Sequence, residues 1–269
     1  MKIVIVVADI FEKFTHNEGV SGAKEVLQKL REVNEWEAFS NSQLIAGQGL
    51  SELEVDHIYC LALSRGVEKN FAYWRLWRNK APADKKTSHK HNPKNVLVST
   101  PTAKGDDCFE SDFIIHHENE LMQDHLTGEH VQGMVLIEAC RQMFLAVKEE
   151  FYLKEFPSDK KYFVINELNI KYLAFAFPVN GKVRYKAIST NRPRSNKLEA
   201  HAHIEINQNG ISTVFMDVKF TVFDGAVLSA KESQLSEAAV SAARAAAVAR
   251  IEEAQNEMGN NFRAVHLWV

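Results

Sequence analysis

The sequence predicts an α+β protein in which an antiparallel sheet wraps around one central helix, preceded by a small α/β unit. Three observations lead to this fold class. Residues 198–207 and 214–222 alternate apolar and polar side chains, as half-buried antiparallel strands do. Residues 133–151 form a helical stretch that is apolar almost all round, which is typical of a buried helix. Residues 2–8 form a continuous β-branched run, which favours a strand covered on both faces.

The small α/β unit is expected over residues 1–80. Its elements are a strand over residues 2–8, a helix over about 21–33 with an apolar stripe, and a second buried strand over the apolar run 57–63. The start of this unit is faintly similar to haloacid-dehalogenase-like phosphatases, but Phe11 stands where such enzymes need a second aspartate. We therefore expect a structural unit. Residues 81–95 are rich in lysine and proline and poor in apolar side chains, which predicts a linker.

The main domain is expected over residues 96–226. Short strands over 95–117 come first, then the buried helix, then a long antiparallel run over 162–223 with tight hairpins at Asn180–Gly181 and Asn209–Gly210. This order is that of the hotdog fold, a sheet wrapped around a central helix. Residues 227–269 follow as an alanine-rich helix and tail, expected to form a packing or oligomer face.

Composition narrows the classes of partner. The chain has 269 residues, 32 Lys and Arg against 35 Asp and Glu, and a formal net charge of -3. No global positive field attracts it to nucleic acid or to an anionic membrane. Its three cysteines are odd in number and far apart, as reduced thiols are. The first apolar run lacks a signal-peptide or membrane-span pattern, so we expect a cytoplasmic protein.

Polar side chains interrupt the buried helix at Glu138, Arg141 and Gln142. This i, i+3, i+4 spacing places them on one face of the helix. Because an unpaired buried charge costs several kcal/mol, Glu138 and Arg141 must pair with each other, with neighbours, or with a ligand. Two interpretations remain open at this point: a structural ion pair beneath the sheet, and a polar site in a hydrophobic cleft.

Two histidines, His125 and His130, lie just before this helix. The helix N-terminus offers unpaired backbone N–H groups that can polarise a thioester or ketone oxygen. A histidine there can move a proton, with Glu138 as the second acid–base group. We therefore predict His125, His130 and Glu138 as catalytic residues, His125 slightly favoured over His130, and we expect Gly133, Met134, Arg141 and Gln142 to contact substrate.

Two weaker patterns concern metals and phosphates. His116, His117, His125, His130, His201 and His203 lack the spacings of common metal motifs, so no metal site is expected, although His201 and His203 share a strand face. The segment 191–197 places Arg192 and Arg194 between two strands. These cations indicate either a solvated hairpin tip or an anchor for the phosphates of coenzyme A or a carrier arm.

The residues at the start of the buried helix resemble known hotdog enzymes. Residues 125–128 followed by 133–139 are similar to the His-x-x-Gly and Gly-x-Leu-x-x-Glu-Ala passage of hotdog 3-hydroxyacyl-carrier-protein dehydratases. Residues 129–142 more closely resemble the signature of the A-factor biosynthesis hotdog family, which makes γ-butyrolactone signals. The resemblance covers residues 94–224.

The resemblance implies condensation of a β-ketoacyl thioester with the hydroxyl of dihydroxyacetone phosphate. The substrate would be acyl-CoA or an acyl carrier protein, with no cofactor. Three alternatives remain: a dehydratase, a thioesterase, and a non-catalytic module that binds an acyl chain. A single hotdog unit leaves a sheet edge and a cleft incomplete, so we expect a homodimer.

Overall fold

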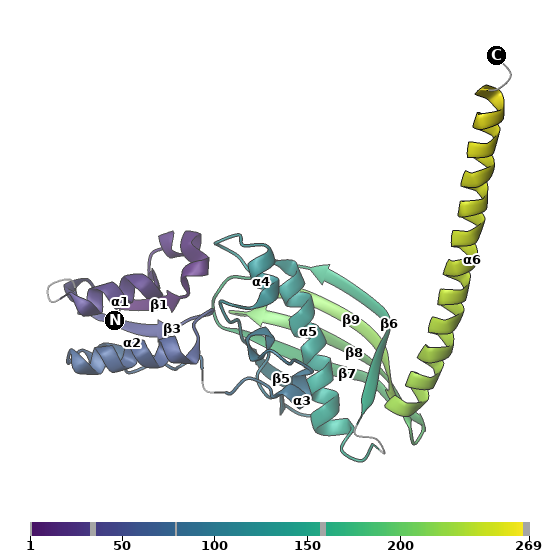
Figure 1. Cartoon of the computed structure of the whole chain (residues 1–269). Coiled ribbons are helices and arrows are strands. Elements are labelled where there is room, and N and C mark those ends of the chain that lie inside the picture. The colour runs from purple at the N-terminus through teal and green to yellow at the C-terminus, as the bar shows by residue number, and fades with distance from the viewer. Residues whose placement is uncertain (1, 33–35, 79, 157–159, 266–269) are drawn as a thin grey trace.

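The computed structural model describes residues 2–32, 36–78, 80–156 and 160–265 and places two sheets side by side (Figure 1). The smaller sheet is parallel, with the order β2-β1-β3. The larger sheet is antiparallel, with the order β4-β5-β7-β8-β9-β6. The strands are β1 (Lys2–Val7), β2 (Val20–Gly22), β3 (Ser42–Ala46), β4 (Thr102–Ala103), β5 (Cys108–Phe113), β6 (Lys161–Tyr172), β7 (Gly181–Arg194), β8 (Lys197–Gln208) and β9 (Ile211–Asp224).

The larger sheet curves around helix α5 (Gly133–Val147), as Figure 1 shows. Strand β8 buries every second residue, and in β9 the alternate residues Val214 to Val222 are also buried. These side chains meet the buried face of α5 in one hydrophobic core. The predicted hotdog fold, with its alternating strands and buried helix, is therefore confirmed. Beyond Val147 the helix continues as one π-helical turn, Lys148–Tyr152.

One of the two predicted hairpins is correct. Asn209 and Gly210 connect β8 to β9 with φ angles of 52° and 85°, which is the positive-φ pair that a tight two-residue hairpin requires. The hairpin predicted at Asn180–Gly181 is wrong. The strand before it, β6, pairs with β9 at the edge of the sheet, whereas β7 pairs with β5 and β8. Residues 173–180 therefore connect strands that are not neighbours.

The small α/β unit contains β1–β3 and two helices, α1 (Ala23–Arg31) and α2 (Glu52–Ser64). The strand predicted over residues 57–63 is wrong, because this segment lies inside α2. Ser51 and Glu54 form a reciprocal capping box at the start of α2, a strong local signal for a helix. Val55, Ile58 and Ala62 then form its buried face.

The small unit is docked on the hotdog domain through the loop after β3. The Gln48 side chain donates to the carbonyl oxygen of Phe113 at 2.7 Å and accepts from the Ile115 N–H at 2.8 Å. The neighbouring Gly49 exchanges backbone hydrogen bonds with Ile115 and His117. Val7 and Phe11 also belong to the core that surrounds α5. The small unit therefore has a core of its own, extends the core around α5 through Val7 and Phe11, and is joined to the hotdog domain by the polar contacts of Gln48 and Gly49.

Residues 81–95, predicted as a linker, fold against α5. They contain α3 (Lys85–Ser88) and the short 3-10 helix η4 (Pro93–Asn95). Asp84 caps α3 through the Thr87 N–H at 2.8 Å, and Ser88 is fully buried. Two of its lysines form ion pairs, Lys90 with Glu138 of α5 and Lys94 with Glu118.

The remaining helices connect or extend these units. They are η1 (Asp9–His16), η2 (Trp36–Phe39), η3 (Glu68–Phe71), α4 (Glu120–Asp124) and α6 (Gly225–Val265). Helix α6 begins directly after β9 and projects away from both units (Figure 1). From residue 229 to residue 255 its side chains are exposed. None of the helices in the described ranges combines the length and apolarity needed to span a bilayer.

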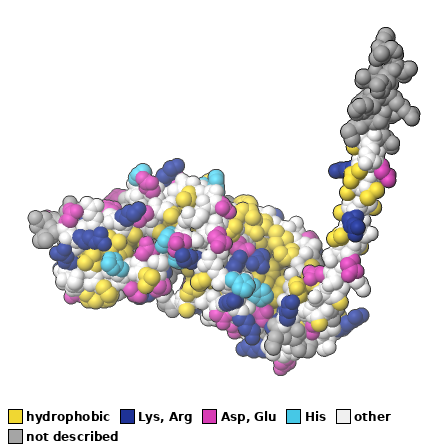
Figure 2. Space-filling model, in the orientation of Figure 1, with side chains coloured by type: hydrophobic (Ala, Val, Ile, Leu, Met, Phe, Trp, Pro, Cys, Tyr) yellow, Lys and Arg dark blue, Asp and Glu magenta, His cyan; other side chains and the backbone are white. Residues whose placement is uncertain are grey.

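The visible surface carries both signs of charge. Figure 2 shows Lys and Arg interspersed with Asp and Glu over both units. In places hydrophobic side chains gather between the charged ones. This distribution agrees with the small net charge of -3. The face in view offers no large field of one sign that would attract a polyanion.

Candidate functional site

The N-terminus of α5 opens into a groove at the end of strand β6. Gln132 is the N-cap and makes no side-chain capping bond to the helix. In the described residues, no acceptor is paired with the backbone N–H groups of Gly133 and Met134. Free N–H groups at a helix start attract an oxygen that carries negative charge. The groove therefore contains a site that can polarise a carbonyl group.

The groove has about 750 Å³ of space, within the range of small-molecule sites. Its outer wall is apolar and exposed, since Met134, Tyr172, Leu173 and Phe175 are 56%, 56%, 56% and 70% exposed. The complete lining is His125, His130, Val131, Gln132, Gly133, Met134, Leu136, Tyr172, Leu173, Ala174, Phe175 and Ala176. Polar groups at one end and apolar side chains along the wall suit a ligand with a reactive head and an acyl tail.

The two predicted histidines both line this groove. His130 is held by Thr127, whose hydroxyl accepts from the His130 N–H at 3.0 Å and donates to its carbonyl oxygen at 2.6 Å. The His130 ring lies 5.0 Å from the ring of Phe175, centroid to centroid. His125 follows α4 and is exposed. Of the two, His130 has the more fixed position.

Tyr172 is a part of the groove that sequence reasoning missed. A Cβ atom added to Gly133 would lie 2.8 Å from the Tyr172 hydroxyl oxygen. The hydroxyl therefore stands against the first residue of α5, and only glycine leaves room for it. Tyr172 is the last residue of the edge strand β6. It lies 39 positions after Gly133 in the sequence. Only the pairing of β6 with β9 places the two together.

Glu138, Arg141 and Gln142 do meet one another, on a different face of α5. The Glu138 carboxylate accepts from Arg141 Nε at 2.7 Å, from Arg141 Nη2 at 3.0 Å and from Gln142 Nε2 at 3.0 Å. It also pairs with Lys90 Nζ at 2.7 Å. Gln142 binds the backbone of Asn95 and Leu97. This network fastens residues 90–97 to α5, and neither Lys90 nor its role was predicted.

The network keeps Glu138 ionised. Burial raises the pKa of its carboxyl, but the hydrogen bonds from Arg141, Lys90 and Gln142 outweigh burial and lower the pKa. Among the described contacts, no hydrogen bond or ion pair links Glu138 to His125 or His130. The structure thus brings the histidines together at the groove and Glu138 with Arg141 elsewhere. This geometry favours the structural ion pair that the spacing left open.

Arg192 and Arg194 lie near the opposite end of α5. Arg192 donates to the carbonyl oxygen of Tyr152 at 2.8 Å, and Tyr152 follows the C-terminus of α5. Arg194 is exposed at the end of β7. Because a 15-residue helix is about 22 Å long, these cations are far from the groove. The structure does not join them to the predicted catalytic residues.

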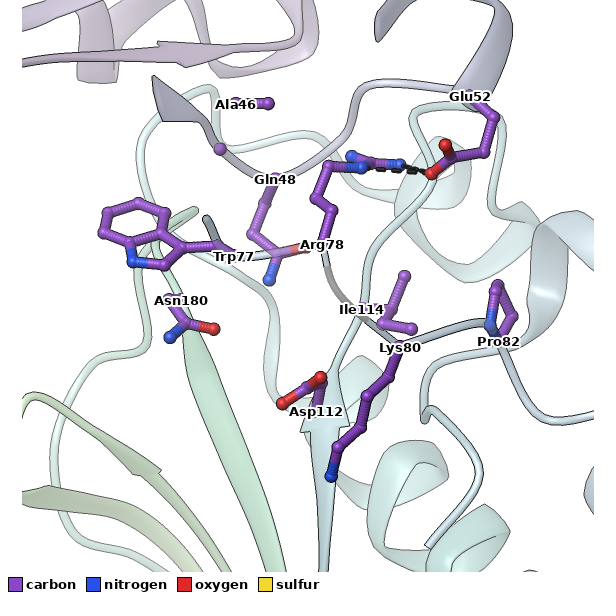
Figure 3. Close-up of a pocket in the computed structure, with 11 residues that line it drawn as sticks. Ala46, Gln48, Glu52, Trp77, Arg78, Lys80, Pro82, Asp112, Ile114 and Asn180 are labelled. Atoms are coloured by element: carbon purple, nitrogen blue, oxygen red, sulfur yellow. Dashed lines mark hydrogen bonds and ion pairs between the residues drawn. The ribbon is translucent and has the colours of Figure 1, made fainter. Parts of the chain in front are cut away.

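A second cavity lies between the two units (Figure 3). It is lined by Gln48, Trp77, Lys80, Asp112 and Asn180 among others, with Arg78 paired to Glu52. Its volume is about 30 Å³, far below the roughly 300 Å³ or more of small-molecule sites. The cavity lies at the polar contact between the units and is too small for a substrate.

Comparison with protein families identifies the domain around α5. The family described as the A-factor biosynthesis hotdog domain matches residues 76–224, which is more than half of the chain. This range includes the groove, the Glu138 network and the segment 81–95. No curated protein sequence matches the chain significantly.

Solved structures that resemble the chain include several described as thioesterases. One from Haemophilus influenzae has 15% identity and a TM-score of 0.39, and the match covers 55% of this chain and 95% of that one. A mutant thioesterase from Pseudomonas aeruginosa has 17% identity and a TM-score of 0.35, covering 55% and 98%. A hypothetical thioesterase protein from Streptococcus pneumoniae, solved with coenzyme A, has 13% identity and a TM-score of 0.32, covering 46% and 84%.

Proposed function

Since the chain belongs to the A-factor biosynthesis hotdog family, we propose that it is an acyltransferase that binds an acyl thioester in the groove at the start of α5. The observation that carries this proposal is the joint presence of free helix N–H groups, a histidine and an apolar wall in one groove. The thioester carbonyl lies at the N–H groups of Gly133 and Met134. The acyl chain lies along Tyr172, Leu173 and Phe175.

The proposed reaction is the transfer of the acyl group from sulfur to oxygen. His130 takes the proton of an acceptor hydroxyl, and the hydroxyl oxygen attacks the thioester carbon. The negative charge that forms on the carbonyl oxygen is stabilised by the helix N–H groups. The carbon–sulfur bond then breaks, and His130 returns the proton to the leaving thiolate. An ester and a free thiol result. We propose coenzyme A or an acyl carrier protein as the thiol.

The proposed acceptor is the hydroxyl of dihydroxyacetone phosphate, and the proposed donor is a β-ketoacyl thioester. Ester formation from these two gives a product that can close to a butenolide. A mass-spectrometric screen of acyl-CoA and acyl-carrier-protein thioesters, each with and without dihydroxyacetone phosphate, tests this assignment. An ester that forms only with the acceptor supports it.

The same screen separates the other activities. Free thiol without the acceptor would identify a thioesterase. Loss of water from a 3-hydroxyacyl thioester would identify a dehydratase. Binding of thioesters with no turnover would identify a non-catalytic acyl-binding module. Any of these three results would overturn the acyltransferase proposal.

Replacement of His130 tests the proton transfer. His130→Ala is expected to lower the turnover by about 10²- to 10⁴-fold, because general acid–base groups contribute on this scale. His125→Ala is compared under the same conditions to decide between the two histidines. His57→Ala is the control, since His57 is exposed on α2, outside the groove. Full activity in folded His125→Ala and His130→Ala variants would contradict histidine catalysis.

A further inference from the structure

Two histidines and an aspartate meet on the outer face of the larger sheet, away from α5. His201 and His203 are alternate residues of β8, on the face opposite to its buried residues. Asp217 lies on β9 as the cross-strand partner of His203. Its Oδ1 atom is 3.0 Å from His201 Nε2, and its Oδ2 atom is 2.9 Å from His203 Nε2.

The spacing of these atoms fits a metal ion. One ligand atom from each of the three residues lies within 4.8 Å of the other two. A tetrahedral ion with bonds of about 2.0–2.1 Å places its ligand atoms about 3.3 Å apart. The separations between Asp217 and the two histidines, 3.0 and 2.9 Å, lie within a few tenths of an ångström of this value, and the histidine nitrogens lie within 4.8 Å of each other. Two imidazoles and one carboxylate are also the ligand types that Zn²⁺ and related ions prefer.

The charged groups on the neighbouring positions are one carboxylate, Asp217, and the two lysines that lie across the strands from the histidines. Lys219, opposite His201 on β9, has its Nζ paired with Glu167 at 2.8 Å, and Lys186, opposite His203 on β7, is exposed to solvent. The three residues are part of β8 and β9, the central strands of the sheet, so their backbone positions are fixed by pairing on both sides.

We propose that His201, His203 and Asp217 bind one divalent transition-metal ion, with Zn²⁺ as the best match, through the two Nε2 atoms and the carboxylate. On binding, each neutral imidazole presents an unprotonated Nε2 to the ion and carries its ring proton on Nδ1. Its fourth position opens into a surface groove lined by Phe215, Lys219 and Glu167, so water or an anionic ligand completes the coordination. The site lies on the opposite side of the sheet from α5 and is independent of the proposed acyl transfer.

A second histidine cluster provides a matched control. His116, His117 and Glu118 also bring ligand atoms within 4.8 Å of one another. However, His116 Nδ1 accepts from the Glu118 N–H at 3.0 Å, His117 Nδ1 faces the Gly49 carbonyl oxygen at 3.1 Å, and Glu118 pairs with Lys94 at 2.6 Å. These residues are engaged in holding the loop, so we expect them to bind metal weakly or not at all.

The test is a titration of the chelator-treated full chain with Zn²⁺, followed by calorimetry, and with Co²⁺, followed by its ligand-field absorption. We expect one strong site per chain. His203→Ala and Asp217→Asn should each weaken Zn²⁺ binding at least about tenfold, since replacing even an outer-shell group can cost that much. His116→Ala combined with His117→Ala should leave the binding unchanged.

Each other result overturns the proposal. Absence of a strong site in the wild-type chain would do so. So would a Zn²⁺ affinity in His203→Ala and Asp217→Asn that equals the wild-type affinity. Loss of binding in the control double variant alone would assign the metal to the other cluster. Circular dichroism of every variant checks that these substitutions of half-buried residues leave the fold intact.

Discussion

Lys148 is a buried amine at the end of α5. Its side chain is fully buried, and its Nζ donates to Thr190 Oγ1 at 2.8 Å. The same atom lies 3.7 Å from the centroid of the Tyr152 ring. Burial lowers its pKa to about 7, although nearby Asp107 opposes the change. A substantial fraction of Lys148 is therefore neutral at physiological pH.

Lys148→Met is expected to stabilise the protein at neutral pH. The folded pKa of about 7 lies below the unfolded value of about 10.4, so the unfolded chain binds more protons between these values. The wild-type stability therefore rises from about pH 7 to about pH 10. The gain from methionine, roughly 1–4 kcal/mol, should be largest at and below pH 7 and should shrink towards pH 10.

Denaturant unfolding of both proteins at about pH 6, 8 and 10 measures this difference. Lys186→Met is the control, because Lys186 is exposed on β7, and its effect should not vary in this way. Parallel pH profiles for wild type and Lys148→Met would show that the amine stays charged in the folded state.

Arg141 separates a structural role from phosphate recognition. Its side chain is 33% exposed and is bidentate to Glu138. If it only neutralises Glu138, Arg141→Lys keeps the charge and most of the activity, and Arg141→Ala lowers the free energy of unfolding by about 1–3 kcal/mol. We expect this outcome, because the contacts of Glu138 with Lys90 and Gln142 already form a closed network.

Steady-state kinetics with dihydroxyacetone phosphate, together with unfolding curves, measure both effects. A rise in the apparent KM for the phosphorylated acceptor in Arg141→Lys, with unchanged binding of the acyl thioester, would instead place Arg141 at the phosphate. That result would require Arg141 to leave Glu138 when the acceptor binds.

At the scale of elements, helix α5 packs against two parts of the protein on two different faces. One face packs into the sheet, and another is tied to residues 90–97 by Glu138 and Gln142. Its first residue contacts the end of β6 through Tyr172. Any change at this first residue therefore acts on the groove rather than on the core.

Gly133→Ala is expected to distort the groove. The new Cβ would lie 2.8–2.9 Å from three atoms at the end of the Tyr172 side chain, so the ring must turn aside, and because Tyr172 is 56% exposed the cost should be at the lower end of about 1–3 kcal/mol. Thermal unfolding and acyl-thioester binding should both weaken. In the Tyr172→Ala background the same substitution should cost little, because the contact is gone. An equal cost in both backgrounds would show that the contact with Tyr172 does not cause it.

The sequence predicted the elements whose pattern is repeated over many residues. The alternation in β8 and β9 and the apolar helix α5 were correct because burial imposes a period on each. The strand prediction for residues 57–63 was wrong because a short apolar segment fits a strand or a buried helix equally well. The Ser51–Glu54 capping box is the local signal that indicates a helix. The contact of Lys90 with Glu138 joins residues 48 positions apart and has no local signal.

In the candidate site, too, the sequence predicted the local features and missed the contacts between distant residues. The helix start, His125 and His130 could be placed from the sequence because they are neighbours along the chain. Tyr172 and Phe175 could not, because their position depends on β6 crossing to the edge beside β9. Among the described residues, Glu138 does not contact either histidine, although the sequence suggested that it would. Positions 133 and 138 project from different faces of α5, so Glu138 faces away from the groove at the helix start.

At the scale of the whole molecule, β6 is an open edge. It is 12 residues long, and among the described strands it has a neighbour only on the β9 side. The exposed apolar side chains of the groove lie at its end. An unpaired edge next to an apolar surface favours association with another strand.

We therefore predict a homodimer formed through β6. Ile165→Lys, at a position of β6 that is 42% exposed, should weaken the dimer because a charge at an edge opposes pairing. Leu53→Lys is the control, since Leu53 is 82% exposed on α2 of the small unit. Sedimentation equilibrium measures the masses. A wild-type chain that is monomeric at micromolar concentration would contradict the prediction.

Helix α6 affects how such a particle moves through solution. Its 41 residues extend about 60 Å at about 1.5 Å each, and Figure 1 shows it standing away from the rest of the chain. A rod of this length adds much friction and little mass. The protein should elute from a sizing column ahead of a sphere of equal mass, so that a monomer imitates a dimer. Removal of residues 227–269 should shift the Stokes radius far more than the loss of mass explains.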